Sequence, residues 1–490
     1  MDVLRRKIAD ESVDLCYIDP PFNSKRNYFQ IYNNIGGEDD RAQSQAFVDT
    51  WEWGAEAVAG LAYITDVANL QNGKLTPQTV DLMRGLHKVL GEGALLAYLV
   101  HMTMRVVEIH RVLKPTGSFY LHCDPTASHY LKVMCDGIFC GQGGDFKNEI
   151  VWHYLKWSVA QRQFVSNHDT ILFYAKSSSK DRVFNTLFME RSPSTKKRFG
   201  NAKIVSSHAD DGTRLPSQVE ESESAGVALD DVWDISRVPP IKMLFPTQKP
   251  EVLLERIIRA STEKGHVVLD AYCGCGTTVM VAQELGRHWI GIDITYQSIS
   301  LILKRLEDEY PKQWTGDNLL LDGVPRDMAS AIALAHRQDD KTRKEFEKWA
   351  ILTYSKNQAR INDKKGADGG IDGTAYFLVS NIENGKVIFQ VKSGGVQRNT
   401  LATLNSDRQR EQAEIGILIT IDTATSAMRK EIAAAGKYKH PMLNREDDRI
   451  QVVTIEEILA GKRIDLPMGR TDTVKSAEAV GDLGKQIPLV

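Results

Sequence analysis

The sequence predicts an α/β protein with a large parallel sheet and a second, smaller α/β domain. Three observations lead to this prediction. Short apolar runs alternate with helical patterns through residues 1–300, which is typical of successive βα units. A glycine-rich turn lies between an apolar run and a helical pattern near residue 275. A second, shorter alternating section begins after residue 370.

The composition bounds the class of protein. A length of 490 residues favours two or three domains. No apolar run could span a bilayer, and the N-terminal residues lack the apolar core of a signal peptide, so we expect a cytoplasmic protein with no membrane partner. The six scattered cysteines fit a reducing compartment. Because the net charge is −3, a nucleic acid would have to be held by a local basic patch.

Strands of the larger part are expected where short apolar runs end on polar or turn residues. A long insertion after the first strand is helical by pattern over 79–113. The stretch 176–245 is irregular and polar, with a basic half before an acidic half, so we place it outside the sheet as an inserted, loop-rich lobe. The expected strands are 14–18, 117–122, 149–154, 170–175, 266–270 and 288–293.

The second alternating section predicts the remaining organisation. A helical stretch follows Arg326, and the last residues have no periodicity, which is typical of a flexible tail. The strands expected after the helical stretch are 374–379, 386–392 and 415–421. The chain is therefore divided into a first domain at 1–325, a helical linker at 326–344, a second domain at 345–469 and a tail at 470–490.

The glycine-rich turn predicts a nucleoside pocket. An apolar strand ends at Asp270, and Gly274 and Gly276 form the turn that follows. Thr277 then opens an amphipathic helix, and a second strand ends on Asp293, where an acid can accept hydrogen bonds from ribose hydroxyls. The third glycine of the dinucleotide fingerprint and the phosphate-loop Lys-Ser/Thr pair are both missing. A nucleoside without a pyrophosphate, such as S-adenosylmethionine, therefore fits better than NAD or ATP.

Residues 14–24, which read DLCYIDPPFNS, place an acid, two prolines and an aromatic residue at the end of a strand. A Pro-Pro turn would explain why the strand ends but is indifferent to Asp19 and Phe22. The amino group of adenine or cytosine is a poor nucleophile, because its lone pair is delocalised into the ring. The Asp19 carboxylate and the Pro20 carbonyl could accept its two protons, and Phe22 could stack on a base that has left the duplex.

Five motifs in the order found here resemble those of the DNA amino-methyltransferases, and the catalytic motif ahead of the cofactor loop matches their beta class. The resemblance covers roughly residues 1–325. It implies a Rossmann-like, S-adenosylmethionine-dependent methyltransferase sheet whose target-recognition region is inserted at 176–245. The five motifs read DPPF, RVLKPTGSFYLHCDP, NEIVW, FPTQKP and LDAYCGCGTT.

The resemblance also implies a reaction and a site. The reaction is methyl transfer from S-adenosylmethionine to an exocyclic amino group of double-stranded DNA, with adenine N6 favoured over cytosine N4 because Asp-Pro-Pro-Phe is commoner in the adenine group. The implied catalytic residues are Asp19, Pro20, Pro21 and Phe22. The implied cofactor-binding residues are Thr247, Lys249, Asp270, Gly274, Gly276, Thr277 and Asp293. Members of the class usually carry a strand and Gly-Asp-Asn before the segment that begins here, which leaves either a misplaced start or a pocket with one contact fewer.

A second set of chemistry-bearing residues lies near the start of the smaller domain's sheet. A glycine-rich turn brings Asp372 to a strand start, a hairpin turn is expected at 384–385, and the next strand ends near Gln390 and Lys392. If the strands pair, alternation places Gln390 and Lys392 on one face beside Asp372. A carboxylate and a carbonyl oxygen can bind Mg²⁺, and the lysine can stabilise a pentavalent phosphate. An ordinary hairpin with a solvated lysine is the alternative.

Residues 345–440 resemble the Mrr-type restriction endonucleases of the PD-(D/E)xK group, in which Gln often replaces the acid. The resemblance implies Asp372, Gln390 and Lys392 as catalytic positions, with Mg²⁺ on Asp372 and Gln390 and with Glu347 as an auxiliary acid. The chain would then be a restriction–modification fusion. The alternatives are a methyltransferase whose C-terminal domain only binds DNA, and a nuclease or DNA-binding protein with an inactive methyltransferase scaffold. A homodimer stays open.

Overall fold

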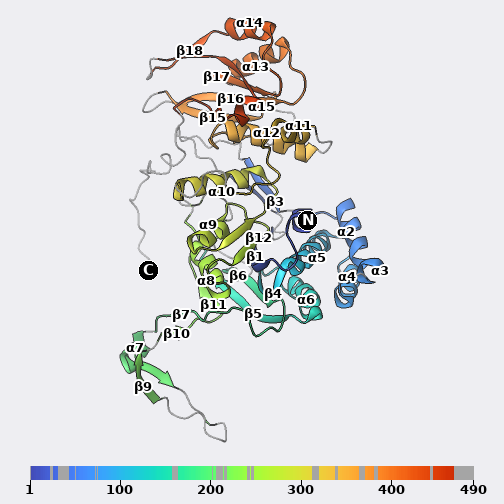
Figure 1. Ribbon diagram of the computed structural model, residues 1–490, viewed down its shortest axis with the longest axis vertical. Helices are drawn as coiled ribbons and strands as arrows, with labels where there is room; N and C mark the ends of the chain where they lie inside the picture. The colour runs from blue at the N-terminus through green and yellow to red at the C-terminus, as the bar shows by residue number, and fades with distance from the viewer. Residues whose placement is uncertain are drawn as a thin grey trace.

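The computed structural model contains two α/β bodies and an arm that extends from the larger one (Figure 1). Within the part of the chain that the structure describes, no helix has the length and apolar character needed to cross a membrane. The structure describes residues 2–21, 26–30, 44–49, 51–71, 73, 75–156, 164–191, 193–200, 202–205, 213, 218–223, 225–239, 243, 248–311, 319–336, 340–362, 370–379, 384–441 and 445–467.

A seven-stranded sheet in the order β11-β5-β6-β4-β1-β12-β13 forms the centre of the larger body. Its strands run parallel except β6, which is antiparallel to both of its neighbours. All six strands expected from the sequence belong to this sheet, which confirms the strands. The expectation of a parallel sheet is wrong, because β6 pairs antiparallel with both neighbours and makes the sheet mixed. The bounds are β1 (Val13–Ile18), β4 (Leu113–Cys123), β5 (Asp145–His153), β6 (His168–Ala175), β11 (Val232–Asp234), β12 (Val267–Asp270) and β13 (His288–Gly291).

Strand β1 lies at the middle of the sheet, and all six of its residues are buried. Cys16 and Ile18 face one core, whereas Leu15 and Tyr17 face the other. Burial on both faces explains why the strand reads as a continuous apolar run. The first core is covered by α2 (Ala55–Thr65), α4 (Pro77–Leu90), α5 (Ala94–Val112) and α6 (Ser128–Ile138), and the second by α8 (Glu251–Ser261) and α9 (Thr277–Glu284).

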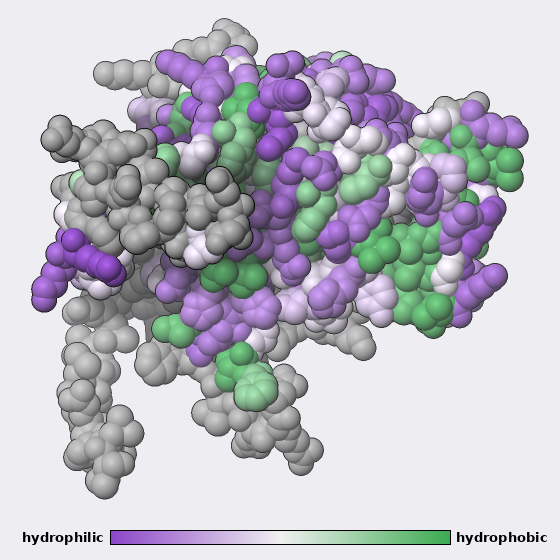
Figure 2. All heavy atoms as spheres, turned by 90° about the horizontal axis from the view of Figure 1, so that it is seen from below, coloured by the Kyte–Doolittle hydropathy of each residue, from purple (hydrophilic) through white to green (hydrophobic). Residues whose placement is uncertain are grey.

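The outer surface of this helical layer keeps some apolar side chains in contact with solvent. Exposed valines occur on α2, α4, α6 and the short α3 (Val67–Gln71), and Figure 2 shows apolar residues on the same side of the molecule. The buried positions of α4 and α5 instead belong to the first core, and α4 packs against α2, α5 and α6.

The stretch 176–245 was expected to lie wholly outside the sheet, and this expectation is wrong for β11, which pairs in parallel with β5 and forms the sheet edge. Trp233 buries its ring there, and its Nε1 donates a hydrogen bond to the Asp230 carbonyl at 2.7 Å. A strand of three residues between acids is too short to show an alternating pattern. The arm in Figure 1 is formed by β7 (Phe188–Met189), α7 (Pro193–Phe199), β8 (Ala202–Val205), β9 (Gln218–Glu223) and β10 (Val227–Ala228).

A five-stranded sheet in the order β14-β15-β16-β17-β20 forms the smaller body. The first three strands are antiparallel, and the last three are parallel. The bounds are β14 (Arg360–Ile361), β15 (Gly373–Leu378), β16 (Asn384–Lys392), β17 (Ile415–Thr420) and β20 (Ile450–Thr454). One face is covered by α11 (Met328–Ala335), α12 (Asp340–Tyr354) and α15 (Ile455–Leu459), and the other by α13 (Arg398–Arg410) and α14 (Ser426–Ala434).

The turn expected at 384–385 is wrong, because these residues lie within a strand of the β15–β16 hairpin. Asn384 and Gly385 pair within the ladder with Leu378 and Phe377, so both belong to β16. The glycine is needed for packing, because a Cβ at Gly385 would lie 2.4 Å from the Phe377 ring. Steric contact with an aromatic side chain, which the sequence does not reveal, explains this glycine.

The two bodies meet through helices. Helix α10 (Tyr296–Glu309), which follows β13, packs against α12, as Figure 1 shows. The residues expected to form a helical linker contribute α11, which buries Ala331 and Ala335 in the core of the smaller body.

We predict that Gly385→Ala destabilises the protein by about 1–3 kcal/mol, because the added methyl group would overpack the Phe377 ring. Urea unfolding of the full chain measures this change. The matched control is Gly394→Ala, since a Cβ at Gly394 meets no atom within 4 Å. Equal stabilities for the two variants would contradict the packing role of Gly385.

Candidate active site

The two motifs predicted to act together end on neighbouring strands. β1 and β12 are parallel, with Leu15 opposite Val268 and Cys16 opposite Leu269. Asp19 and Asp270 therefore follow at the same edge of the sheet, where open α/β sheets bind their ligands. The charge of Asp19 also contributes to the raised pKa of Asp270, as expected of close neighbours. The structure thus brings the DPPF motif and the glycine turn together.

Asp19 presents one engaged and one unengaged carboxylate oxygen. Its Oδ2 is ion-paired with Lys249 Nζ, and both side chains are largely buried. Its Oδ1 is buried and accepts no hydrogen bond from any residue that the structure describes. A buried acceptor without a donor is costly, so the Oδ1 atom is well suited to a donor from a bound molecule.

Lys249 is a predicted cofactor-binding residue, and in the structure it forms an ion pair with Asp19 of the DPPF motif. The residue lies just before α8 and far from Asp19 in the sequence. Only the fold therefore reveals this contact. Pro20 is buried and Pro21 is partly buried beside Asp19. Phe22 and Thr247, the other predicted residues of these two motifs, lie outside the described residues.

The glycine turn has the tight geometry that the sequence predicts. Gly274 and Gly276 have φ values of 47° and 78°, in the left-handed region that favours glycine. A Cβ at Gly276 would also lie 2.5 Å from the Ile302 side chain. Thr277 is buried at the start of α9, directly after the turn. The turn is therefore fixed by both backbone conformation and packing.

Asp293 holds this turn from the end of the next strand. Its Oδ2 accepts a hydrogen bond from the Gly274 N–H at 3.0 Å. Its Oδ1 accepts from the Thr295 N–H at 2.9 Å and from the Thr295 hydroxyl at 3.1 Å. Oδ2 keeps a second lone pair, so these contacts orient the acid without exhausting its capacity to accept.

Asp270 is the most perturbed acid of the site. Burial raises its pKa to about 7, although its carboxylate accepts hydrogen bonds from the Thr278 hydroxyl at 2.6 Å and from the Tyr272 N–H at 3.0 Å. The charges of Asp19 and Asp293 raise it further. Three carboxyl groups thus lie close together, and a site of this kind favours a ligand that carries positive charge.

A hydrogen-bonded network next to Asp19 was not predicted from the sequence. A 2.9 Å hydrogen bond joins the Tyr17 hydroxyl to Nδ1 of His122, and His122 Nε2 lies 3.3 Å from Asp169 Oδ2. The Tyr154 hydroxyl donates to the other oxygen of Asp169 at 2.9 Å. The His122 side chain is fully buried.

The network connects to the DPPF motif through charge. Burial alone would raise the pKa of Asp169, but the contacts with His122 and Tyr154 and the charge of Lys249 hold that pKa at about 2. The charge of Asp19, after burial, helps to raise the pKa of Tyr17. His122 lies within the quoted motif on a strand beside β1, so it could have been found. Asp169 could not, because β6 runs antiparallel and its place depends on the strand order.

The predicted residues of the smaller body also come together. The Asp372 N–H donates to the Phe389 carbonyl at 2.8 Å, and its Oδ2 accepts from the Val391 N–H at 2.7 Å, which places Asp372 opposite Gln390. Burial raises the pKa of Glu347, and the charge of Asp372 raises it further, so this acid also lies nearby. Lys392 is exposed at the end of β16.

Gln390 provides the test of whether this cluster fits a metal ion. Its side chain is 4% exposed, and Nε2 donates to the Gly370 carbonyl at 2.9 Å. Its Oε1 is buried and has no partner within the described ranges. The described residues contain no group of three or more His, Cys, Asp or Glu that could hold a metal. A fit to Mg²⁺ therefore depends on the Gln390 oxygen together with the two carboxylates.

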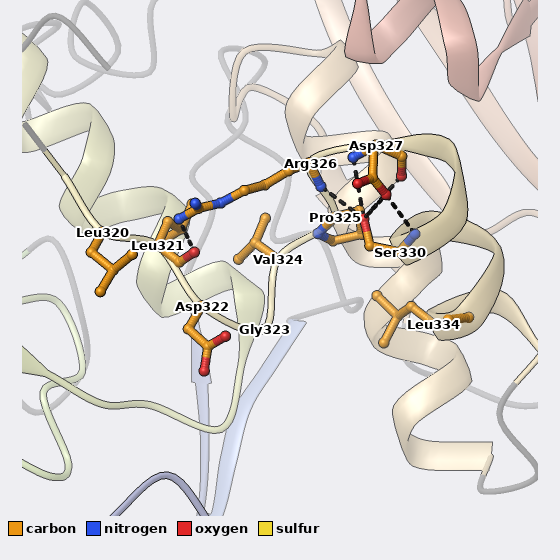
Figure 3. A pocket seen from close by; sticks show the side chains of 11 residues that line it. Leu320, Leu321, Asp322, Gly323, Val324, Pro325, Arg326, Asp327, Ser330 and Leu334 are labelled. Atoms are coloured by element: carbon orange, nitrogen blue, oxygen red, sulfur yellow. Dashed lines mark hydrogen bonds between the residues drawn. The ribbon is translucent and has the colours of Figure 1, made fainter. Parts of the chain in front are cut away.

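A cavity of about 400 Å³ lies away from both clusters, in the segment that connects the two bodies (Figure 3). Asp327 caps α11 there by accepting a hydrogen bond from the Ser330 N–H at 2.7 Å, and the Arg326 side chain reaches the Leu321 carbonyl. The polar groups of this cavity thus serve the local fold. The lining consists of residues 320–327, Ser330, Ala333 and Leu334.

Comparison with known proteins finds a family for each body. Residues 13–304 match the family described as DNA methylase. Residues 343–460 match the family described as NACHT-associated inactive Restriction Endonuclease 1. The first match takes in the Asp19 motif and the glycine turn, and the second takes in the cluster around Asp372.

Individual relatives resemble the larger body. The DNA adenine methyltransferase YhdJ of Escherichia coli (strain K12) is 28% identical over 313 residues, which cover 62% of this chain and 79% of that protein. The Type II methyltransferase M.HpaI of Haemophilus parainfluenzae is 31% identical over 209 residues, which cover 41% of this chain and 57% of that protein.

The M1.HpyAVI–SAM complex aligns with a TM-score of 0.31 at 17% identity and covers 62% of this chain and 93% of that one. The PvuII DNA methyltransferase (cytosine-N4-specific) aligns with a TM-score of 0.33 at 14% identity and covers 62% of this chain and 82% of that one.

We predict that Asp270→Asn stabilises the protein relative to the original chain as the pH rises. Between pH 4 and 7 the folded chain keeps a proton on Asp270 that the unfolded chain loses, so the stability from the protonated carboxyl declines over this window. The difference in unfolding free energy between the variant and the original chain should therefore grow by about 2–3 kcal/mol from pH 5 to pH 8.

Urea unfolding of the full chain at several pH values measures this difference. Glu307→Gln, which changes an exposed acid of α10, is the matched control for removing a carboxylate without burial. A pH-independent difference for Asp270→Asn would mean that Asp270 ionises as an ordinary carboxyl group.

Proposed function

Because this chain belongs to the DNA methylase family, we propose that its larger body transfers a methyl group from S-adenosylmethionine to N6 of adenine in double-stranded DNA. The observation that carries this proposal is the buried Oδ1 of Asp19, which has no donor among the described residues and lies at the sheet edge shared with the glycine turn. An exocyclic amino group is a donor of the kind that this oxygen needs.

The proposed chemistry follows from the residues at this edge. Bound S-adenosylmethionine supplies an electrophilic methyl group on a sulfonium. Asp19 Oδ1 accepts one hydrogen of the target amino group and the Pro20 carbonyl accepts the other, which makes the nitrogen lone pair available for attack. Lys249 holds the second oxygen of Asp19, so that the carboxylate keeps its orientation. Asp19 can also accept the proton that the methylated nitrogen releases.

The glycine turn and its acids are the proposed cofactor site. Gly274 and Gly276 would let the backbone approach the nucleoside closely, and Asp293, which orients the turn, would accept hydrogen bonds from the ribose hydroxyls. The group of carboxyls formed by Asp19, Asp270 and Asp293 suits the positive charge of a sulfonium. Thr247 and Phe22 keep their proposed roles, in cofactor binding and base stacking respectively, although both lie outside the described residues.

Two observations favour adenine as the target. The motif reads Asp-Pro-Pro-Phe, which is commoner in the adenine group of the resembling methyltransferases. A relative that matches over 313 residues carries the name DNA adenine methyltransferase. The arm that contains α7 is the proposed target-recognition region, and the last turn of α7 carries three basic residues, Lys196, Lys197 and Arg198.

A second candidate function concerns the smaller body, for which we propose Mg²⁺-dependent cleavage of DNA. Gln390 Oε1 supports it, because this buried oxygen lacks a partner in the described structure and lies on the residue opposite Asp372. Asp372 and Gln390 would hold the ion, Glu347 would assist as an acid, and Lys392 would stabilise the phosphate. The matching family is described as inactive. Its description favours the alternative, a domain that binds DNA without cutting it.

We predict that Asp19→Ala lowers the rate of methyl transfer roughly 10²–10⁴-fold, because the target amino group loses its acceptor. Incorporation of labelled methyl groups into duplex DNA measures the rate, and sequencing of the modified positions identifies the base. Binding of S-adenosylmethionine, measured by calorimetry, should persist. Asp81→Ala, which changes an exposed acid of α4, is the control. Full activity of Asp19→Ala would refute the proposed role.

For the smaller body, we predict that the full chain nicks or cuts plasmid DNA in the presence of Mg²⁺ and that Lys392→Ala reduces cutting to background. Lys430→Ala, on the exposed surface of α14, should cut normally. Cutting that persists in Lys392→Ala would disprove the nuclease assignment. Plasmid that stays intact with the original chain, together with retarded migration on a gel, would favour a domain that only binds DNA.

A further inference from the structure

The smaller body contacts the larger one directly beside the proposed cofactor site. Helix α10 begins at Tyr296, three residues after Asp293. The Tyr296 N–H donates a hydrogen bond of 2.8 Å to Oε2 of Glu345, which lies on α12 of the smaller body. The Glu345 side chain is 23% exposed, and its other oxygen is 3.1 Å from Lys348 Nζ. An acid from one body thus caps a helix of the other.

This cap supplies a charge that α10 lacks. The first N–H groups of a helix have no partner within the helix, and negative charge is favourable near them. The Thr295 hydroxyl accepts from the Ser298 N–H at 3.3 Å, but the first turn of α10 contains no acid of its own. Glu345 therefore provides the carboxylate that a helix of this length commonly carries in its own sequence.

The start of α10, which Glu345 caps, also contacts Asp293. Asp293 accepts two hydrogen bonds from Thr295 and one from Gly274. A continuous chain of contacts thus runs from Glu345 through Tyr296 and Thr295 to the acid that orients the glycine turn. A shift of the first turn of α10 would move the partner of Asp293.

Two further contacts fix α10 on the smaller body. The hydroxyls of Tyr296 and Thr353 form a 3.0 Å hydrogen bond, and the Tyr296 ring packs on the core of the smaller body. One turn later, the Asn357 side chain donates to the Ser300 carbonyl at 3.2 Å. The start of α10 is therefore attached at several points, and Glu345 makes the contact to the backbone N–H of Tyr296.

We propose that Glu345 is a positioning residue for S-adenosylmethionine, so that the smaller body completes the cofactor pocket of the larger one. Glu345 acts without touching the cofactor. It holds the start of α10, and through Thr295 it holds Asp293 in the orientation that the ribose requires. The inference rests on the proposed function, and it assigns a role in cofactor binding to a residue outside the stretch 13–304 that matches the DNA methylase family.

The test compares cofactor affinity with DNA affinity in the full chain. Calorimetric titration with S-adenosylmethionine should show a dissociation constant about three- to thirty-fold higher for Glu345→Ala, the range expected when a helix cap is lost. Glu345→Gln keeps an acceptor oxygen but loses the charge, so its dissociation constant should fall between those of the original chain and Glu345→Ala. The dissociation constant for duplex DNA should not change in either variant.

Steady-state kinetics add a readout that a merely structural role would not give. The KM for S-adenosylmethionine should rise in Glu345→Ala, while kcat at saturating cofactor should stay within about two-fold, because the reacting groups are untouched. Glu307→Ala, at an exposed position of the same helix α10, is the matched control and should leave both constants unchanged.

Each outcome decides the inference. Equal cofactor affinity in the original chain and in Glu345→Ala would overturn it, and so would a parallel loss of cofactor and DNA affinity, which would indicate general unfolding. If Glu345→Ala does not fold, Glu345→Gln carries the same comparison, and unchanged cofactor affinity there would overturn the inference. An original chain that binds no S-adenosylmethionine would instead refute the proposed function, before any substitution is made.

Discussion

The parallel pairing of β1 with β12 is the constraint on which the rest of the structure depends. These strands are separated by most of the larger body in sequence, yet their register brings Asp19 and Asp270 to one edge of the sheet. Burial on both faces fixes β1, because a slip by one residue would exchange the side chains that face the two cores. The hydrophobic cores therefore determine which polar side chains share the edge.

Burying several acids at this edge is unfavourable by itself, and the surrounding contacts offset the cost only in part. Asp19 has an ion pair with Lys249, Asp169 has His122 and Tyr154, and Asp293 has backbone donors. Asp270 has two hydrogen bonds, yet its pKa remains near 7. The site thus keeps an excess of negative charge that a cationic ligand would relieve, which is a common feature of binding sites in folded proteins.

Much of this architecture could be predicted from the sequence, because local patterns report on strands, turns and catalytic motifs. The six central strands, the glycine turn and the meeting of Asp372 with Gln390 follow from such patterns. What could not be predicted depends on contacts between distant segments. The edge strand β11 is too short to show a pattern, and Gly385 is explained only by the Phe377 ring. The partners of Lys249 and Asp169 likewise depend on strand order, which no local pattern contains.

Helix α12 limits how far the two bodies can be separated, because it has a role on each of its sides. Glu345 contacts the larger body, whereas Glu347, two residues later and therefore on the opposite side of the helix, lies near Asp372. Dividing the gene between the two matched segments would remove Glu345, Thr353 and Asn357 from α10, even if each product folded. The start of α10 would then keep only the Thr295 hydroxyl as a cap. A substitute domain would need side chains that make the same contacts at the equivalent places on its own helix.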